Sequence, residues 1–345
     1  MAEAEKVMGV SADDIEKIMG VAKADIEKVM GVEIPSGLAW GGTRAVIAGG
    51  TNAAHGDLNR IQYKTVGATA NTVDFGDLQT TRSDMSCSGS NGTRGIFGGG
   101  MQTIEGATAY GVTDTDYVTI ASTGDGTDFG NLDEASSYGV HSGCSNGTLL
   151  FSAGGLTPAY GYLDRLEYYT IASTGNGTDA GDISIGNLLN PGATNGDTRF
   201  LLAGGYMDPS NAYTDSILYH NFSTSADTSD FGDLTAASYE SAGCASTVRA
   251  VFQLPMIAFN TMEYVTVAST GDSSDFGDLA TGRNDSTGNS DGTSGEFSGG
   301  NSGSSGYMHQ NMNEIDKITI GTTGNATDIG DLLEINKENG ATSGD

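Results

Sequence analysis

The chain has 345 residues, of which 53 are glycine and only 5 proline, and its 44 acidic residues outnumber 15 basic ones to give a formal net charge of −29. So acidic a protein repels phosphate backbones, which argues against nucleic-acid binding. The sequence contains no run of about 18 apolar residues and no basic-then-apolar leader, so neither a transmembrane helix nor a secretory signal is expected.

Residues 1–35 carry an eleven-residue repeat whose copies end in Met-Gly-Val. Ser11 and the aspartates after it suit a helix start and Gly20 suits a helix stop, so we expect short helical turns. Helices this short are marginal alone in water, so their apolar side chains must pack against the following domain or, as we favour, against another chain. The side chains expected to dock are Val7, Met8, Ile15, Ile18, Met19, Ile26, Val29 and Met30.

From residue 42 to residue 332 one unit is repeated six times. Five copies have a glycine pair, which Leu254-Pro255 replaces in the fifth copy. Every copy then has a variable segment, a tyrosine slot, which Lys317 fills in the sixth copy, and a closing Asp-Phe-Gly-Asp-Leu or a variant of it. The tyrosine and phenylalanine slots are twelve residues apart in all six copies, as from Tyr63 to Phe75. A constant interval that contains a turn predicts a hairpin of fixed register, and a variable segment predicts a surface loop.

Each unit therefore predicts four short strands: an inner strand, the strand before the glycine pair, the tyrosine strand and the phenylalanine strand. Such units, repeated six times, predict an all-β, six-bladed propeller over residues 36–345, with an open β-solenoid as the alternative. Either flank can supply the missing inner strand of the first blade, and Trp40 favours the N-terminal flank. Four units have an arginine five residues before the glycine pair, which we expect to bond backbone or carboxylates between blades: Arg44, Arg94, Arg199 and Arg249.

The glycine pair, the variable loop, the tyrosine and an aromatic at a fixed distance resemble the kelch repeat. The resemblance covers residues 42–332, with phenylalanine at positions where that family typically has tryptophan. It implies a kelch-like propeller of four-stranded antiparallel blades. It implies no function, because kelch propellers have many unrelated roles.

We expect no enzyme, cofactor or metal site. The four histidines fall in different units without metal-ligand spacing, and neither a nucleophile elbow nor a phosphate loop is present. The odd number of cysteines on separate repeats argues against disulfides, so Cys144 and Cys244 are expected to be small buried residues of inner strands. The repeated aspartates are expected to cap their own turns, with calcium binding as the alternative.

The variable loop after the second strand and the link between blades share one face of an antiparallel blade. The variable segments 51–60, 101–114, 156–164, 206–215, 256–261 and 301–313 should therefore gather on one face. Their aromatics suit recognition of carbohydrate or protein, although they could equally pack the loops down. The candidate binding residues are His55, Met101, Tyr110, Tyr160, Tyr162, Tyr206, Met207, Tyr213, Tyr307 and His309.

Residues 90–100 and 117–132 look like kelch-type repeats of tailed-bacteriophage virion proteins, and residues 15–21 and 26–32 are similar to repeats of phage tail and fibre components. The resemblance implies a virion structural protein, made in the host cytoplasm and present in several copies, that docks on other virion proteins through residues 1–35. We expect a tail-fibre or peripheral adhesin that presents its propeller to a host-surface glycan or protein. The alternatives are a capsid decoration or neck/tail bridging protein without a receptor role and, less expected, a glycan-active propeller enzyme.

Overall fold

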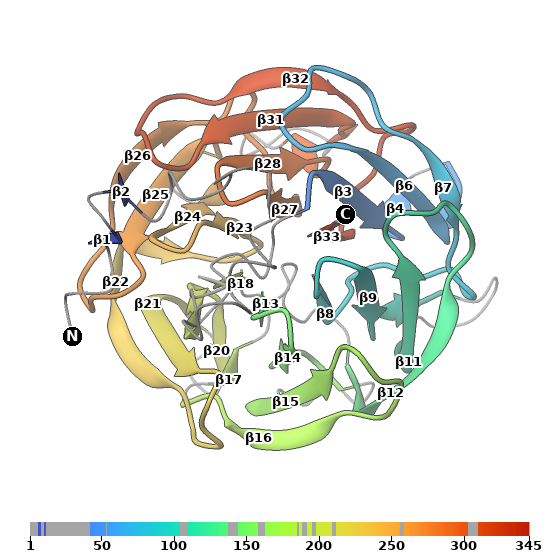
Figure 1. Ribbon diagram of the computed structural model, residues 1–345, viewed down its shortest axis with the longest axis horizontal. Helices are drawn as coiled ribbons and strands as arrows, with labels where there is room; N and C mark the ends of the chain where they lie inside the picture. Colours follow the sequence, from blue (N-terminus) through green and yellow to red (C-terminus); the bar gives the residue numbers. More distant parts are fainter. Residues whose placement is uncertain are drawn as a thin grey trace. The chain divides into compact units, whose positions relative to one another are not determined.

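The chain divides into two compact units, Met1–Gly37 and Leu38–Asp345. The computed structural model describes residues 6–7, 10–11, 42–52, 54–103, 110–136, 144–157, 163–184, 186–187, 192–194, 198–208, 212–255, 259–302 and 310–344. The second unit consists of antiparallel sheets arranged in a ring as six blades (Figure 1). The open solenoid is therefore excluded.

Each blade has an innermost strand, two middle strands and an outermost strand, in the order in which they are hydrogen-bonded. Blade 1 has β33 (Gly340–Gly344), β3 (Arg44–Ala48), β6 (Arg60–Thr65) and β7 (Val73–Asp77); blade 2 has β8 (Cys87–Ser90), β9 (Arg94–Gly98), β11 (Tyr110–Thr119) and β12 (Thr127–Ser136); blade 3 has β13 (Cys144–Ser145), β14 (Leu149–Ala153), β15 (Arg165–Thr170) and β16 (Thr178–Asp182). Blade 4 has β18 (Gly192–Thr194), β19 (Arg199–Ala203), β21 (Ala212–Asn221) and β22 (Ser229–Ser238); blade 5 has β23 (Ala242–Ala245), β24 (Arg249–Gln253), β25 (Thr261–Thr266) and β26 (Ser274–Asp278); blade 6 has β27 (Thr287–Ser290), β28 (Ser294–Ser298), β31 (Glu314–Thr319) and β32 (Thr327–Asp331).

The ring is closed by the C-terminal strand. β33 pairs with β3 over five residues, from Arg44 opposite Gly344 to Ala48 opposite Gly340, and the two strands lie side by side in Figure 1. The preference for the N-terminal flank, which rested on Trp40, is therefore wrong. Ala341 belongs to the apolar cluster between blades 6 and 1 together with Ile47, so the C-terminal strand also completes the core.

The twelve-residue interval corresponds to the hairpin between the third and outer strands, as predicted. The register of this pair shifts by one residue in every blade, for example between Ile61 and Gln62. Such a β-bulge bends a strand and increases its twist. The glycine of Asp-Phe-Gly-Asp lies at the bulge, with φ at +151° for Gly232. The fixed spacing thus preserves a bulged hairpin in each blade.

The predicted arginines join neighbouring blades. Arg44 Nη1 donates a hydrogen bond of 2.7 Å to the carbonyl oxygen of Ile120 in the next blade, and Arg94 and Arg249 make equivalent bonds of 3.1 Å. The Arg44 guanidinium also lies 4.6 Å from the centre of the Tyr63 ring. Tyr63 meets Phe75 edge to face at 5.7 Å. The repeated arginine, tyrosine and phenylalanine therefore form one stack in each of blades 1, 2, 4 and 5, which is favourable both as cation–π and as aromatic packing.

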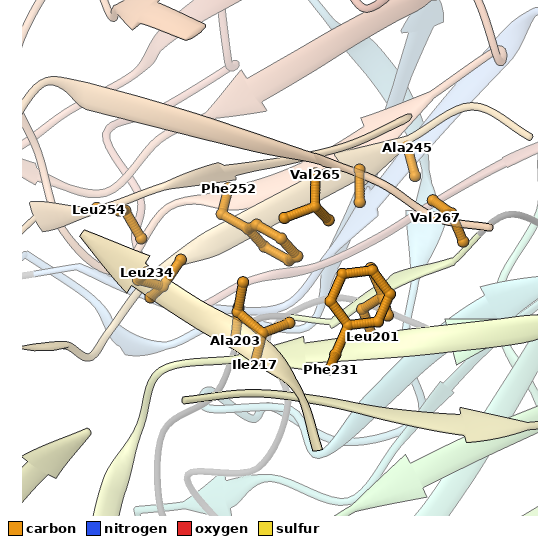
Figure 2. Packing of buried hydrophobic residues seen from close by; sticks show 11 residues of the cluster. Leu201, Ala203, Ile217, Phe231, Leu234, Ala245, Phe252, Leu254, Val265 and Val267 are labelled. Atoms are coloured by element: carbon orange, nitrogen blue, oxygen red, sulfur yellow. The ribbon is translucent and has the colours of Figure 1, made fainter. Parts of the chain in front are cut away.

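The hydrophobic core is divided into clusters between neighbouring blades. Figure 2 shows the cluster in which Phe231 and Leu201 of blade 4 pack against Phe252 and Val265 of blade 5. Equivalent clusters of buried residues lie at the other five junctions of the ring. Each blade therefore buries its apolar residues against both neighbours, and its stability depends on the ring being closed.

The inner strands are joined by serine hydroxyls. Ser343 donates through Oγ to the carbonyl oxygen of Ser290 in blade 6, at 2.5 Å. Ser290 donates in turn to Ala245 of blade 5 at 2.7 Å, and Ser145 donates to Ser90 of blade 2 at 3.1 Å. All three cysteines are buried free thiols on inner strands, as predicted for two of them.

In the first unit, β1 (Lys6–Val7) pairs with β2 (Val10–Ser11). Helical turns are not shown in this segment, and the four described residues are extended, in keeping with the β-branched valines at two of them. The docking side chains other than Val7 (Met8, Ile15, Ile18, Met19, Ile26, Val29 and Met30) lie outside the described residues.

Candidate functional site

One face of the ring carries the described parts of the variable loops together with the links between blades, and we call it the linker face. Gly50 N donates to Arg82 O in the link from blade 1 to blade 2, and Gly300 N donates to Asn336 O in the link from blade 6 to blade 1. Short strands extend four of the loops over this face: β4 (Thr51–Asn52) with β5 (Gly56–Asp57), β10 (Met101–Gln102) with β11, β17 (Gly186–Asn187) with β20 (Tyr206–Asp208), and β29 (Asn301–Ser302) with β30 (Gln310–Asn311).

The predicted loop residues do not form one continuous patch. His55 is exposed, and its Nδ1 lies 3.5 Å from Glu334 Oε2. Met101 is half-buried, and its backbone forms an isolated antiparallel β-bridge with Ser83. Tyr110 is 37% exposed and donates to Gln102 Oε1 at 2.7 Å. The backbone of Met207 pairs with β17; Tyr160, Tyr162, Tyr307 and His309 lie outside the described residues.

Two of the predicted tyrosines do come together on blade 4. Tyr213 is 41% exposed and stacks on Tyr239, with ring centres 4.2 Å apart and planes 3° from parallel. Tyr206 meets the Tyr213 ring at 5.6 Å with its plane turned by 60°. Tyr239 lies in the link from blade 4 to blade 5 and was not predicted. The result is a cluster of three tyrosines, the tyrosine platform, in which Tyr213 is the most exposed.

A repeated acid of the links was also missed. Asp84, Glu240, Asp285 and Glu338 each lie six residues after the leucine that ends the Asp-Phe-Gly-Asp-Leu segment or its variant. All four have positive φ, between 48° and 61°, a conformation that is uncommon for residues other than glycine. Backbone hydrogen bonds join them in sequence around the ring, from Asp84 N to Glu338 O, from Glu338 N to Asp285 O and from Asp285 N to Glu240 O. A fixed spacing in the sequence could have revealed them.

These acids lie close together, three of them buried and Glu240 half-buried. Burial raises the pKa of Glu240 to about 7, with the charge of Asp285 acting in the same direction. Burial and the charge of Glu338 raise the pKa of Asp84 well above its ordinary value, and the carboxyl groups of Asp84 and Glu338 are hydrogen-bonded to each other. Lys337 pairs with Glu338 and lies 3.6 Å from Asp285 Oδ2. Burial would lower the pKa of Lys337, but these carboxylates raise it instead.

The buried carboxyl of Asp84 makes stability depend on pH. Because its pKa in the folded protein lies above the ordinary 3.8, its contribution is complete below that value and is lost as pH rises through the folded pKa. Asparagine resembles the protonated acid, tolerates the positive φ and does not titrate. We therefore expect Asp84→Asn to raise the melting temperature by a few degrees at pH 8 and to change it little at pH 4.

Thermal unfolding followed by circular dichroism at both pH values measures this difference. His220 is also buried and its pKa is lowered by burial, but it titrates alike in both proteins and cancels in the comparison. The exposed Asp74→Asn on β7 is the matched control and should show no such gain. Equal melting temperatures of Asp84→Asn and the parent at pH 8 would contradict the assignment.

The aspartates of the repeated turns act as caps. Asp128, Asp179 and Asp328 each accept a hydrogen bond from the backbone N–H two residues on, at 3.0–3.1 Å, as the capping interpretation predicted. Among the residues that the structure describes, no three His, Cys, Asp or Glu side chains converge in a group that could hold a metal ion. No helix in this part of the chain is long and apolar enough to cross a membrane.

The fold defines this chain as a six-bladed β-propeller of kelch-like architecture. Among solved structures it is similar to YjhT, a kelch-repeat protein of E. coli, with a TM-score of 0.64 and 11% sequence identity over 83% of this chain and 94% of that one. At this identity the likeness concerns the fold alone. No protein-family model and no curated protein sequence matches the chain.

Proposed function

We propose that this chain is a structural protein of a bacteriophage virion and that the linker face of its propeller binds a glycan of the host surface. The assignment to a virion rests on the sequence resemblance of residues 15–21, 26–32, 90–100 and 117–132 to phage virion proteins. Residues 1–35 are proposed to attach the propeller to other virion proteins.

The assignment of a binding role rests on the tyrosine platform. The exposed ring of Tyr213 offers an apolar face of the kind on which sugar rings stack, and Tyr239 fixes its orientation from behind. Tyrosine supplies a large rigid contact area with little loss of conformational entropy on binding. Glu240, next to Tyr239 in the chain, places a carboxylate beside the platform that can accept hydrogen bonds from hydroxyl groups.

We propose binding without catalysis. A glycosidase needs two carboxylates that are free to act on one glycosidic bond. Glu240, with its pKa near 7, suits a general acid. Asp285 is less suited as its partner, because Asp285 Oδ2 accepts hydrogen bonds from Asn301 at 3.0 Å and Asn284 at 3.4 Å and lies 3.6 Å from Lys337 Nζ. Release of reducing sugar from a bound glycan would favour the enzyme instead.

The glycan proposal is tested with the full chain on an array of bacterial surface glycans. We expect saturable binding to at least one glycan class and a loss of at least tenfold in affinity for Tyr213→Ala, since aromatic anchors dominate such interfaces. Val248→Ala is the matched control, because Val248 is 63% exposed in the turn between β23 and β24, away from the variable loops. Equal binding by Tyr213→Ala and the parent would refute a role for the platform.

The virion proposal has a separate test. An antibody raised against the full chain should label intact phage particles in electron micrographs. Label on fibres supports an adhesin, whereas label on the capsid or neck, combined with no glycan binding, supports the decoration or bridging role. Unlabelled particles would refute the virion assignment.

A further inference from the structure

In the links of the linker face, four acidic side chains lie together, and one cation in the described part of the chain forms ion pairs with them. Asp84, Asp285 and Glu338 are at most 7% exposed, and Glu240 is half-buried beside them. Lys337 is the one cation that forms ion pairs with this group among the described residues, and it pairs with Glu338 and Asp285. No ion pair of the described residues involves Glu240. Buried carboxylates without a counter-ion are unfavourable, so the group lacks positive charge.

Two buried amides at the same place have an unsatisfied oxygen. Asn284 is 8% exposed and its Nδ2 donates to Glu240 Oε2 at 2.5 Å; Asn301 is 4% exposed and its Nδ2 donates to Asp285 Oδ2 at 3.0 Å. Oδ1 of each residue is buried and has no hydrogen-bond partner. Buried polar atoms in native proteins are nearly always paired, so two such oxygens beside two carboxylates call for a missing partner.

The two carboxylates and the two amides together identify that partner. The unsatisfied atoms, Oδ1 of Asn284 and Oδ1 of Asn301, are both acceptors, so the partner is a donor or a cation. Because Oδ1 of both amides is enclosed, the partner is small. The nitrogen and oxygen of an amide exchange places when its terminal torsion turns by half a rotation. Asn284 and Asn301 can thus direct oxygen, in place of nitrogen, towards the carboxylates once a cation lies between them.

We propose that Glu240, Asp285, Asn284 and Asn301 bind one calcium ion in the links between blades 4, 5 and 6. Calcium takes six to eight oxygen ligands, accepts carboxylate and amide oxygens together and tolerates irregular geometry, whereas magnesium demands a near-ideal octahedron. Two carboxylates and two amides supply four ligands, and water supplies the remainder. The ion would join two consecutive links of the ring, those from blade 4 to blade 5 and from blade 5 to blade 6, to the variable loop of blade 6 at Asn301. It does not require that the face bind a glycan.

The test uses the full chain after removal of metals with EDTA. Titration with calcium chloride at constant ionic strength should give saturable heat in calorimetry, with one ion per chain at this site, and should raise the melting temperature. Magnesium at the same concentration should have a smaller effect. Glu240→Gln and Asn301→Ala should each lower calcium affinity at least tenfold. Asp57→Asn is the matched control, because Asp57 is an acid of the same face that bonds Ser83 instead.

A further variant guards against a loss of binding caused by misfolding. Asn301→Asp keeps the shape of the side chain and adds a carboxylate, so it should bind calcium more tightly than the parent. The melting temperatures of all variants in EDTA report their folding. Absence of saturable calcium binding by the parent would overturn the proposal, and so would unchanged affinity in both Glu240→Gln and Asn301→Asp. Equal stabilisation by sodium or potassium would overturn the choice of a divalent ion.

Discussion

A chain that ends at Asn339 should fail to keep its ring closed and should be largely unfolded at 37 °C. It lacks β33, whose five residues pair with β3 along their whole length. At about 1 kcal/mol for each net hydrogen bond, the loss of this pairing alone approaches the 5–15 kcal/mol by which most domains are stable. Ala341 would also leave the cluster between blades 6 and 1, and the serine hydroxyl bonds from Ser343 to Ser290 and from Ser90 to Ser343 would be lost.

Thermal unfolding and size-exclusion chromatography of the shortened chain measure this effect. A synthetic peptide of residues 338–345 should restore part of the melting temperature in a concentration-dependent way, because it binds the folded ring and not the unfolded chain. The same peptide with Thr342→Pro should not, since Thr342 pairs with Val46 of β3 and proline has no N–H to donate to this ladder. A shortened chain that melts like the parent would show that β33 contributes little to closure.

Much of the propeller could be predicted because six copies of one unit report on the same contacts. The interval from Tyr63 to Phe75 recurs unchanged because the same bulged hairpin forms in every blade. In four blades the two rings at its ends also meet. The variable segments differ in length because their described parts extend over the linker face, outside the four-stranded frame of the blade. A physical constraint repeated six times is visible in a single sequence, whereas a constraint that occurs once is not.

The closing strand is such a single feature. Trp40 suggested the wrong flank because a lone tryptophan carries no periodic information. The correct flank did carry a signal: Leu332 and Glu338 are six residues apart, like Leu279 and Asp285 before the inner strand of blade 6. The small residues of Gly340–Gly344 then match those of the other inner strands. An alignment of the links, and not only of the glycine pairs, would have placed β33.

The candidate site was predicted only in part, for a related reason. Aromatics in variable loops are recognisable as types, so Tyr206 and Tyr213 were found. Their packing partner Tyr239 was not, because it lies in a link. The acids of the links were overlooked because a repeated acid suggests a structural cap, and only their burial and their positive φ distinguish them from Asp128 or Asp328, which do cap turns.

The second large effect concerns the contact between neighbouring blades at the outer hairpins. The backbone N–H of Gly271, in the turn of blade 5, donates at 2.8 Å to the carbonyl oxygen of Phe231 in blade 4. Asp272 Oδ1 accepts from Asp233 N at 3.1 Å in the same contact. A Cβ at Gly232 would lie 2.4 Å from the carbonyl oxygen of Gly271. The glycine of Asp-Phe-Gly-Asp is therefore required by the approach of the next blade as well as by its own backbone.

Gly232→Ala should accordingly destabilise the ring by about 2–6 kcal/mol, from the strain of an unfavourable φ, about 1–3 kcal/mol, and from overpacking, typically about 1–3 kcal/mol. Gly271→Ala separates the two causes. Gly271 has φ of +154° against +151° for Gly232, but a Cβ there meets nothing within 4 Å. It should show the strain alone and melt several degrees above Gly232→Ala in parallel thermal scans. Equal losses in the two variants would mean that backbone conformation, and not the contact between blades, keeps glycine in the repeat.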